Sequence, residues 1–396
     1  MRIRKTIVAV LASAAAATAG VLAHSGTADA AVTWPAHYSA PYVDISLYPT
    51  FNLTQAAQQS GNKFFTLGFI LNTGGTCNAG WSSYTALDTG FLQSDIASLR
   101  AAGGDVAISV GGANGSEPAQ SCTTASSLQA QYQRIIDNYK ISHLDFDVEG
   151  GALSDTASVD RRNKAIAGLE AANPSLKVTY TLPVLPSALT QPGIDLLRNA
   201  VSNNARVDVV NMMTMDYGSA NSNMGGAATS AATALVSQLG SIFTGRTSAQ
   251  LWAMVGITPM IGQNDSQGEI FSLNDAQTVL SFANAHGITE LSFWSAGRDN
   301  GSCPGQTYAS PSCSGLSQAQ WAFTHLFAPF TPGGGVVTPP PTTPPTGCAG
   351  AWSSSTAYVG GSVVSYSGHK WTAKWWTQGD IPGNNSQAVW VDNGTC

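Results

Sequence analysis

Short apolar runs alternate with longer stretches of helical periodicity through most of the chain. The runs end in Gly, Pro or polar residues, a pattern typical of parallel strands joined by crossover helices. Eight candidate strands follow from it: Tyr42–Leu47, Lys63–Ile70, Asp105–Val110, His143–Val148, Lys177–Leu182, Asp208–Met213, Ala253–Thr258 and Glu290–Trp294. Helical patterns lie between them, for example over Ala125–Asn138 and Ser158–Ala172.

Eight such units predict a (β/α)8 barrel, an α/β fold whose chemistry lies at the carboxyl ends of its strands. A doubly wound open sheet is the alternative interpretation. Because no Gly-rich phosphate fingerprint follows an early strand, the barrel is favoured.

The first thirty residues have the composition of a signal peptide. A basic start is followed by an alanine-rich apolar run and by a small-x-small pattern at Ala28–Ala30. A membrane anchor is the alternative, but the run is interrupted by Ser13 and Gly20, and no second apolar segment follows. We therefore expect a secreted, extracellular protein with no membrane association.

A Gly-rich and Pro/Thr-rich segment at residues 331–347 cannot build a core, which predicts a linker. It divides the mature chain into a barrel domain at 31–330 and a small domain at 348–396. The small domain is too short for a stable core without a covalent staple.

The composition is acidic and poor in charge, with a formal net charge of −6 and 10% charged residues. Removal of the leader makes the charge more negative, which argues against nucleic acid as a partner. Abundant Gly, Ser, Thr and Asn suit an exported protein that acts on a neutral polymer. We expect a monomer.

Six cysteines, an even number in an exported chain, predict disulfides. Their positions indicate three local bridges: Cys77 with Cys122, Cys303 with Cys313, and Cys348 with Cys396. Zinc binding is the alternative, but no Cys-x-x-Cys occurs and few histidines are available.

The fourth candidate strand carries a row of acids, Asp145, Asp147 and Glu149. Residues two apart on a strand share a face, so the three carboxyl groups point one way, towards the barrel interior. Like charges at this spacing raise the pKa of at least one acid, which keeps a proton available near neutral pH. A calcium loop is the alternative, but the spacers Phe146 and Val148 are strand formers.

Three further motifs accompany this row in strand order. Gly111 and Gly112 follow the third strand in Ser109-Val110-Gly111-Gly112, and Trp294 ends the eighth. The sixth strand leads into a polar end at Asp216 and Tyr217; the candidate residues it contributes are Met213, Met215, Asp216 and Tyr217.

Together these motifs resemble family 18 of the glycoside hydrolases, the chitinase family, over residues 35–330. Its signature Asp-x-x-Asp-x-Asp-x-Glu is filled in its last three places, with Ser142 in the first. The strand-six motif, Met-x-Tyr-Asp, is matched by Met213 and Asp216, while Met215 replaces the tyrosine and Tyr217 follows the aspartate.

The resemblance implies a retaining, substrate-assisted hydrolysis of β-1,4 linkages in chitin. Glu149 would be the proton donor, Asp147 would orient the substrate's acetamide, and Asp145 would tune Asp147. Asp216 and Tyr217 are the candidates for holding the acetamide, and Trp294 would form the floor under the sugar. We expect no cofactor and no metal, and, from the short segment between Asp216 and the seventh strand, endo action.

The small domain holds five of the ten tryptophans, too many to bury in so short a segment. Its pattern resembles carbohydrate-binding modules of families 5 and 12, which implies that Trp375 and Trp376 contact chitin. On a regular strand these neighbours would face opposite ways, one towards the core. The sequence leaves open whether the module also binds cellulose.

Three other functions are compatible with parts of this pattern. An endo-β-N-acetylglucosaminidase shares the acidic strand, but the chitin-type tail argues against it. A non-catalytic lectin on the same barrel typically lacks the glutamate, which is present here. A cellulase is the third, and an assay that offers soluble cellulose beside chitin oligomers would distinguish it.

Overall fold

The computed structural model describes residues 32–333, 350–354, 356–358, 361–384 and 389–395. The predicted signal peptide at 1–30, all but the first three residues of the predicted linker, and both Cys348 and Cys396 lie outside the described residues. In the described part of the chain no helix is long and apolar enough to cross a membrane.

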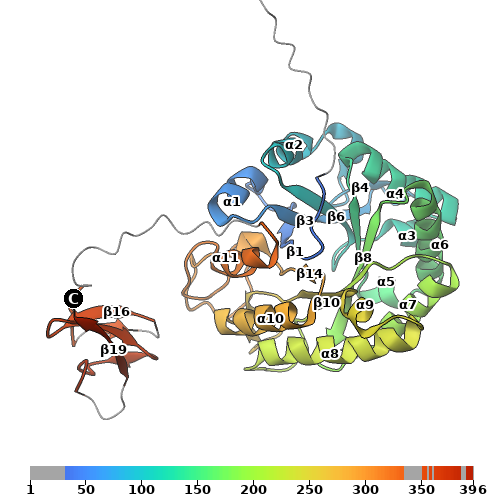
Figure 1. Cartoon of the computed structure of the whole chain (residues 1–396). Coiled ribbons are helices and arrows are strands. Elements are labelled where there is room, and N and C mark those ends of the chain that lie inside the picture. The colour runs from blue at the N-terminus through green and yellow to red at the C-terminus, as the bar shows by residue number, and fades with distance from the viewer. Residues whose placement is uncertain (1–31, 334–349, 355, 359–360, 385–388, 396) are drawn as a thin grey trace, which may run out of the picture.

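A closed ring of parallel strands forms the centre of the barrel domain (Figure 1). Its members are β2 (Tyr42–Asp44), β3 (Phe64–Asn72), β6 (Asp105–Gly111), β7 (His143–Asp147), β8 (Lys177–Leu185), β10 (Val209–Met213), β11 (Val255–Thr258) and β14 (Glu290–Leu291). The short β1 (Tyr38–Ser39) pairs with β14 while β2 pairs with β3, so the segment 38–44 closes the ring. The predicted (β/α)8 barrel is confirmed.

The first and last barrel strands are shorter than the sequence pattern predicts. Strand β2 ends at Asp44 because the chain then turns into a loop, where Asp44 Oδ1 accepts hydrogen bonds from the Ser46 backbone N–H and hydroxyl. Strand β14 ends at Leu291, although Trp294 N–H still donates to Pro259 O at 2.8 Å. Backbone pairing therefore reaches the end of the predicted strand without regular ladder geometry.

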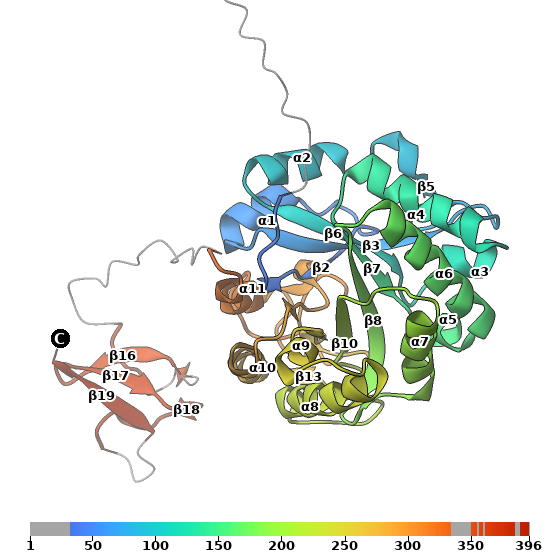
Figure 2. The same ribbon diagram turned by 45° about the vertical axis from the view of Figure 1, so that its right-hand side comes forward.

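Helices cover the outside of the ring, as Figures 1 and 2 show. They are α1 (Leu53–Ser60), α2 (Gln93–Ala101), α3 (Pro118–Ser121), α4 (Ala125–Tyr139), α5 (Gly150–Ser154), α6 (Thr156–Ala172), α7 (Gln191–Ser202), α8 (Met224–Ile242), α9 (Ser248–Trp252), α10 (Leu273–His286) and α11 (Ala322–Phe327), with 3-10 turns η1 (Leu87–Thr89), η2 (Ala296–Arg298) and η3 (Ala328–Phe330). The two helices predicted by example correspond to α4 and α6. Side-chain caps start several helices, as where Thr124 Oγ1 accepts from Ser127 N–H at 3.1 Å.

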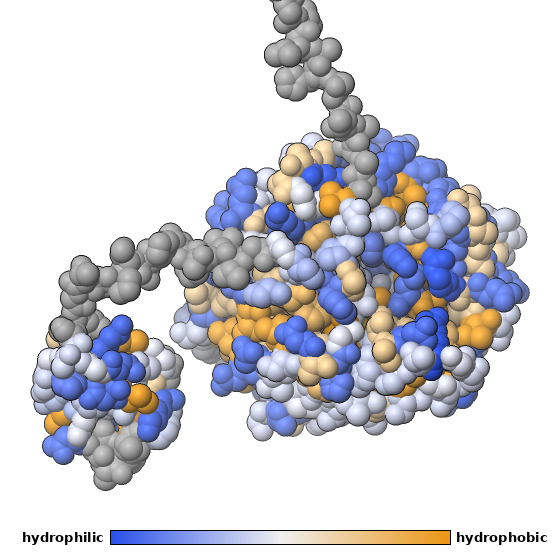
Figure 3. Space-filling view, viewed as in Figure 1, coloured by the Kyte–Doolittle hydropathy of each residue, from blue (hydrophilic) through white to orange (hydrophobic). Residues whose placement is uncertain are grey.

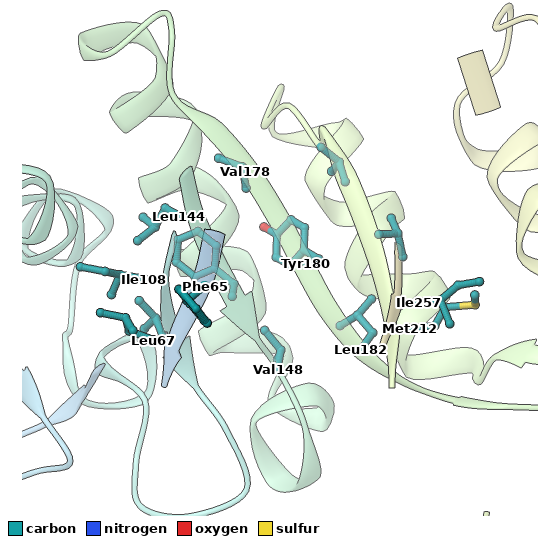
Figure 4. Packing of buried hydrophobic residues seen from close by; sticks show 14 of the residues in the cluster. Phe65, Leu67, Ile108, Leu144, Val148, Val178, Tyr180, Leu182, Met212 and Ile257 are labelled. Atoms are coloured by element: carbon teal, nitrogen blue, oxygen red, sulfur yellow. The ribbon is translucent and has the colours of Figure 1, made fainter. Parts of the chain in front are cut away.

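The main core lies between the strands and this helical layer. Figure 4 shows apolar side chains of neighbouring strands packed beside one another, among them Phe65, Leu144 and Tyr180. Phe146 of β7 packs edge-on against Tyr132 of α4, with ring centroids 5.0 Å apart. The odd-numbered residues of β7 therefore point to the opposite face, into the barrel.

Short accessory strands pair with the barrel strands or with each other. The antiparallel β4 (Ala79–Trp81) and β5 (Thr85–Ala86) extend β3, β9 (Ala188–Leu189) pairs with β8, and β12 (Gly262–Gln263) pairs with β13 (Ile270–Phe271). Figure 3 shows hydrophilic and weakly polar residues over much of the visible face, with hydrophobic residues between them.

Both ends of the described barrel segment are fixed to it. Asp105 Oδ2 accepts from Val32 N–H at 3.1 Å and from Trp34 Nε1 at 3.2 Å. Thr331, which the sequence pattern assigns to the linker, is buried, and its Oγ1 accepts from Ser39 N–H at 2.8 Å. The barrel therefore extends beyond residue 330, because a buried side chain holds the next residue in place.

The small domain is all β in its described residues. Its strands are β15 (Ala357–Tyr358), β16 (Val363–Tyr366), β17 (His369–Ala373), β18 (Thr377–Gln378) and β19 (Trp390–Thr395), all paired antiparallel. Val364, Ala373, Val389 and Trp390 form a small core of their own.

Candidate active site

A cleft of about 760 Å³ lies at the carboxyl ends of the barrel strands. Its lining comes from strand ends and the loops after them: Tyr42, Asp44, Ser46, Phe69, Leu71, Ser82, Ser83, Tyr84, Ala113, Asn114, Gly115, Asp147, Glu149, Thr181, Pro183, Val184, Met213, Met215, Asp216, Thr258, Met260, Asp265, Trp294, Arg298, Ala309, Ser310 and Pro311. This is the end of the fold at which barrel enzymes carry their chemistry.

The three acids of the row that begins on β7 lie at different depths relative to this cleft. Asp147 and Glu149 line it, while Asp145 is buried beneath them in the barrel. Glu149 lies two residues beyond the end of β7, just before α5, and its backbone is still extended, with φ −137° and ψ 175°. Two of the three predicted acids are therefore in reach of a ligand, and the third supports them from below.

Asp145 is held by three hydroxyl donors from three other strands. Ser109 Oγ and Tyr42 Oη donate to its Oδ2 at 2.5 and 2.9 Å, and Thr181 Oγ1 donates to its Oδ1 at 2.7 Å. Burial raises the pKa of Asp145 to about 6, although these hydrogen bonds lower it. The arrangement favours the ionised form, since a carboxylate can accept all three bonds.

A second row of polar residues supports this arrangement. Asn211 Nδ2 donates to Thr181 Oγ1 at 3.0 Å, and Thr258 Oγ1 donates to Asn211 Oδ1 at 2.8 Å. Because Thr181 receives a hydrogen bond from Asn211, its own proton is directed at Asp145. The orientation of the hydroxyl groups is thus set across three strands.

Asp147 lies between Asp145 and Glu149 and is almost fully buried. Burial raises its pKa well above the ordinary value, and the charges of Glu149 and Asp145 raise it further. Its Oδ1 has no hydrogen-bond partner within the described residues. This oxygen is available to a ligand in the cleft.

Glu149 is half-buried, and burial raises its pKa to about 7, with the charge of Asp216 as the next cause. A carboxyl group with this pKa is partly protonated at neutral pH. It can therefore give a proton and later take one back, which general acid–base catalysis requires.

The two glycines of the third strand allow close packing beside the acids. A Cβ on Gly111, whose φ is +114°, would lie 2.0 Å from Asp147 O. A Cβ on Gly112, whose φ is +88°, would lie 2.9 Å from the ring of Phe69. Neither glycine lines the cleft; they set the spacing of β6 against β7 and Phe69.

The strand-six residues divide between the cleft and the core. Met213, Met215 and Asp216 line the cleft, but Tyr217 does not and packs against the main core. Glu269 fixes this turn by accepting from Tyr217 N–H at 3.1 Å. Met213 and Met215 keep the strand alternation, but Asp216 has a φ of +51°, which turns the next residue, Tyr217, away from the cleft.

Trp294 lines the cleft from the segment after β14 and stacks on Phe69, with ring centroids 5.7 Å apart and planes 16° apart. The neighbouring Arg298 is buried, and its guanidinium donates to the backbone carbonyls of Ile261 at 2.8 Å, of Gln263 at 2.5 Å, and of Ser310. Arg298 thereby connects two loops that form a wall of the cleft.

Both disulfides within the described residues match the predicted pairs, Cys77 with Cys122 and Cys303 with Cys313. The second closes the loop that supplies Ala309–Pro311 to the cleft. In the described part of the chain no group of three His, Cys, Asp or Glu side chains is placed to hold a metal ion.

Motif analysis missed Tyr42, Thr181 and Asn211. Each comes from a different strand and belongs to no local motif, and partners such as Tyr42 and Asp145 lie 103 residues apart. The signal for them was a polar side chain at an inward-facing position of a barrel strand.

In the small domain Trp375 and Trp376 are both exposed, by 47% and 62%. They lie in a bend between β17 and β18, so the strand alternation that would send one inward does not apply. The Lys374 ammonium lies over the Trp375 ring, 5.8 Å from its centroid.

The barrel matches a solved structure, the catalytic domain of a hyperthermophilic chitinase from Pyrococcus furiosus. The two are 35% identical with a TM-score of 0.71, and the match covers 77% of this chain and 98% of that one. The chain belongs to family 18 of the glycoside hydrolases. The acidic strand and the final tryptophan of this family 18 barrel thus meet at one cleft, and the glycine pair packs beside them against Asp147 and Phe69.

Other relatives of this family 18 protein are known from sequence. It is 39% identical over 315 residues to a probable bifunctional chitinase/lysozyme of Escherichia coli, covering 75% of this chain and 35% of that protein. It is 38% identical over 279 residues to endochitinase 11 of Metarhizium anisopliae, covering 67% and 53%. The chain thus matches between about a third and a half of these curated relatives. A family model for carbohydrate-binding module family 5/12 matches residues 351–391.

Proposed function

We propose that this protein is a secreted chitinase that hydrolyses β-1,4 linkages between N-acetylglucosamine units. The observation that carries the proposal is the row on β7, with Asp147 and Glu149 at the floor of an open cleft and Asp145 held beneath them. Family membership and the carbohydrate-binding module support the choice of substrate.

Glu149 is the proton donor in this proposal. With a pKa near 7 it holds a proton at neutral pH and transfers it to the glycosidic oxygen as the bond from that oxygen to C1 breaks. The substrate's own acetamide oxygen forms the new bond to C1, giving an oxazolinium ion. Glu149 then takes a proton from water, whose oxygen attacks C1 on the face that the leaving sugar occupied, while the bond from C1 to the acetamide oxygen breaks and the acetamide is restored. The configuration at C1 is therefore retained.

Asp147 orients the acetamide and stabilises its positive charge. Its buried carboxyl has a free Oδ1, which can accept the acetamide N–H and so direct the carbonyl oxygen at C1. Asp145, which accepts three hydroxyl hydrogen bonds, stays negatively charged beneath Asp147. This charge favours the protonated form of Asp147 or Glu149.

The remaining candidates are assigned by their position. Asp216 lines the cleft and is proposed to hold the acetamide, together with the side chains of Met213 and Met215. Tyr217 packs against the core and does not contact the acetamide in this proposal. Trp294 offers the flat apolar surface on which a sugar ring stacks.

Endo action is proposed because no inserted domain covers the cleft among the described residues. Within the described residues, only the β12–β13 ribbon and α10 lie between β11 and β14, with no inserted domain to close the cleft. We propose that the module at 348–396 holds the enzyme on insoluble chitin through Trp375 and Trp376.

The proposal is tested by digesting soluble chitin oligomers and recording product lengths and anomers by proton spectroscopy during the first turnovers. We expect internal cleavage and an initial excess of β-anomer. An initial excess of α-anomer would contradict the mechanism. Hydrolysis of soluble cellulose with no hydrolysis of chitin oligomers would contradict the substrate.

A further inference from the structure

Three tyrosines stand out on the surface of the barrel. Tyr48, Tyr84 and Tyr308 are exposed by 97%, 76% and 69%, and they are the highly exposed large aromatic side chains among the described residues of this domain. An exposed tyrosine offers a ligand both a flat apolar ring and a hydroxyl group, so the positions of these three are informative.

All three adjoin the cleft or its continuation. Tyr84 lines the cleft itself, and Tyr308 directly precedes the segment Ala309–Pro311 that lines it. Tyr48 lines a second pocket of about 290 Å³. Tyr84 and Tyr48 thus each line one of two depressions, and Tyr308 adjoins the first.

The second pocket continues the cleft. Both are lined by Asp44 and Pro311, which form the boundary between them. The far walls come from the loop after β2, from α1 and from the segment before α11. A polymer that leaves the cleft over Asp44 therefore enters this pocket next.

The chemistry of the second pocket suits an uncharged polar ligand. Asp44 is the one charged residue in its lining, and Asp44 Oδ1 is already engaged by Ser46, which leaves Oδ2 as an acceptor. Gln55 and Gln320 add side-chain amides that donate and accept hydrogen bonds. A ring face beside amides and a single acceptor matches the hydroxyl groups and apolar faces of a sugar.

We propose that the Tyr48 pocket is an accessory subsite that holds sugar units of the same neutral polysaccharide chain, beyond those bound in the cleft. This inference rests on the proposed function. It predicts that long oligomers gain affinity from Tyr48, whereas oligomers that end within the cleft do not.

The test compares Tyr48→Ala, Tyr48→Phe and the unchanged protein on chitin oligomers of increasing length. Tyr48→Ala should raise KM about three- to tenfold for the long oligomers and leave KM for the short ones unchanged, since one ring stacking contact is lost. Tyr48→Phe keeps the ring and should behave as the unchanged protein. Val201→Ala, an exposed change at the end of α7, is the control.

Binding measurements separate this subsite from the proposed function. Calorimetry with the same oligomers in the Glu149→Gln background should show the same loss for Tyr48→Ala, restricted to long oligomers. Equal affinity of the Tyr48→Ala and Tyr48 proteins at every length would overturn the subsite while leaving the chitinase proposal intact. A protein that binds the long oligomers through Tyr48 but cleaves none would overturn the proposed activity alone. Absence of binding at every length would overturn both.

Discussion

Glu149 stands where β7 gives way to α5, and its surroundings differ from those of the two acids before it. Burial and the charge of Asp216 raise its pKa to about 7, whereas Asp145 is surrounded by hydroxyl donors that favour its charged form. A carboxylate and a proton donor thus lie four residues apart along the same segment of chain. Their different environments, not their identical chemistry, separate their roles.

The pH dependence of turnover follows from this pKa. Glu149 is protonated below about pH 7, so kcat/KM should fall as the pH rises through 7, where the proton donor loses its proton. Asp216→Asn removes a neighbouring negative charge, which lowers the pKa of Glu149. The fall of kcat/KM on the alkaline side, the alkaline limb of the profile, should therefore begin at a lower pH. Profiles of kcat/KM between pH 4 and 10 on a soluble oligomer check both.

A limb that stays at the same pH in Asp216→Asn would show that another group controls it. A profile that is flat from neutral to alkaline pH would contradict the role of Glu149. Thr278→Ala, a change on the exposed side of α10, serves as the control and should leave the profile unchanged.

The row on β7 was predictable from sequence because alternation alone sets which side chains share a face. Its supporting residues were not, since Tyr42, Thr181 and Asn211 reach Asp145 or one another across the barrel and belong to no local motif. The orientation of Tyr217 also depends on context. Continued alternation would place Tyr217 on the face of Met213 and Met215, but the positive φ of Asp216 breaks it and gives the cleft side to Asp216.

Among the elements, β6 and β7 approach most closely where the glycine pair meets Asp147. Gly111 and Gly112 have positive φ, and neither tolerates a Cβ without a shift of Asp147 or Phe69. The motif therefore sets the position of the catalytic strand and contributes no side chain to the cleft. In the small domain, Trp375 and Trp376 lie in a bend between two strands. Both rings are exposed there, whereas a regular strand would bury one of them.

Gly111→Ala should destabilise the protein by about 2 kcal/mol or more, because the new methyl group meets the Asp147 carbonyl and the backbone is strained at positive φ. Gly151→Ala is the matched control, since a Cβ there has no neighbour within 4 Å. Urea unfolding measures both free energies. Equal stability of the two variants would show that β6 and β7 are not packed as described.

At the scale of the whole molecule, the chain combines a barrel with an open cleft and a small domain with an exposed aromatic pair. The composition of residues 331–347, which cannot build a core, predicts a linker between the two domains. The exact end of the barrel was not predictable, since Thr331 is ordinary in sequence and is held only by its contact with Ser39.

The module should matter for the polymer and not for the chemistry. The double variant Trp375→Ala/Trp376→Ala should lose most binding to insoluble chitin and slow its degradation, while kcat and KM on soluble oligomers stay unchanged, because the two rings belong to the binding module. Val391→Ala, another exposed change in the same domain, should bind as the unchanged protein does. Pull-down on insoluble chitin and oligomer kinetics give the two readouts. Full retention of the double variant on chitin would place the binding surface elsewhere.

The most direct test of the account is the turnover of Glu149→Gln on soluble chitin oligomers, measured beside binding of the same oligomers. The substitution keeps the shape of the side chain and removes the proton, so turnover should fall by at least about 100-fold, as expected of a positioned acid, while binding is retained. Glu170→Gln, which alters a buried carboxyl on α6 outside the cleft, is the control and should remain active. If Glu149→Gln keeps more than about a hundredth of the unchanged rate, Glu149 is not the proton donor.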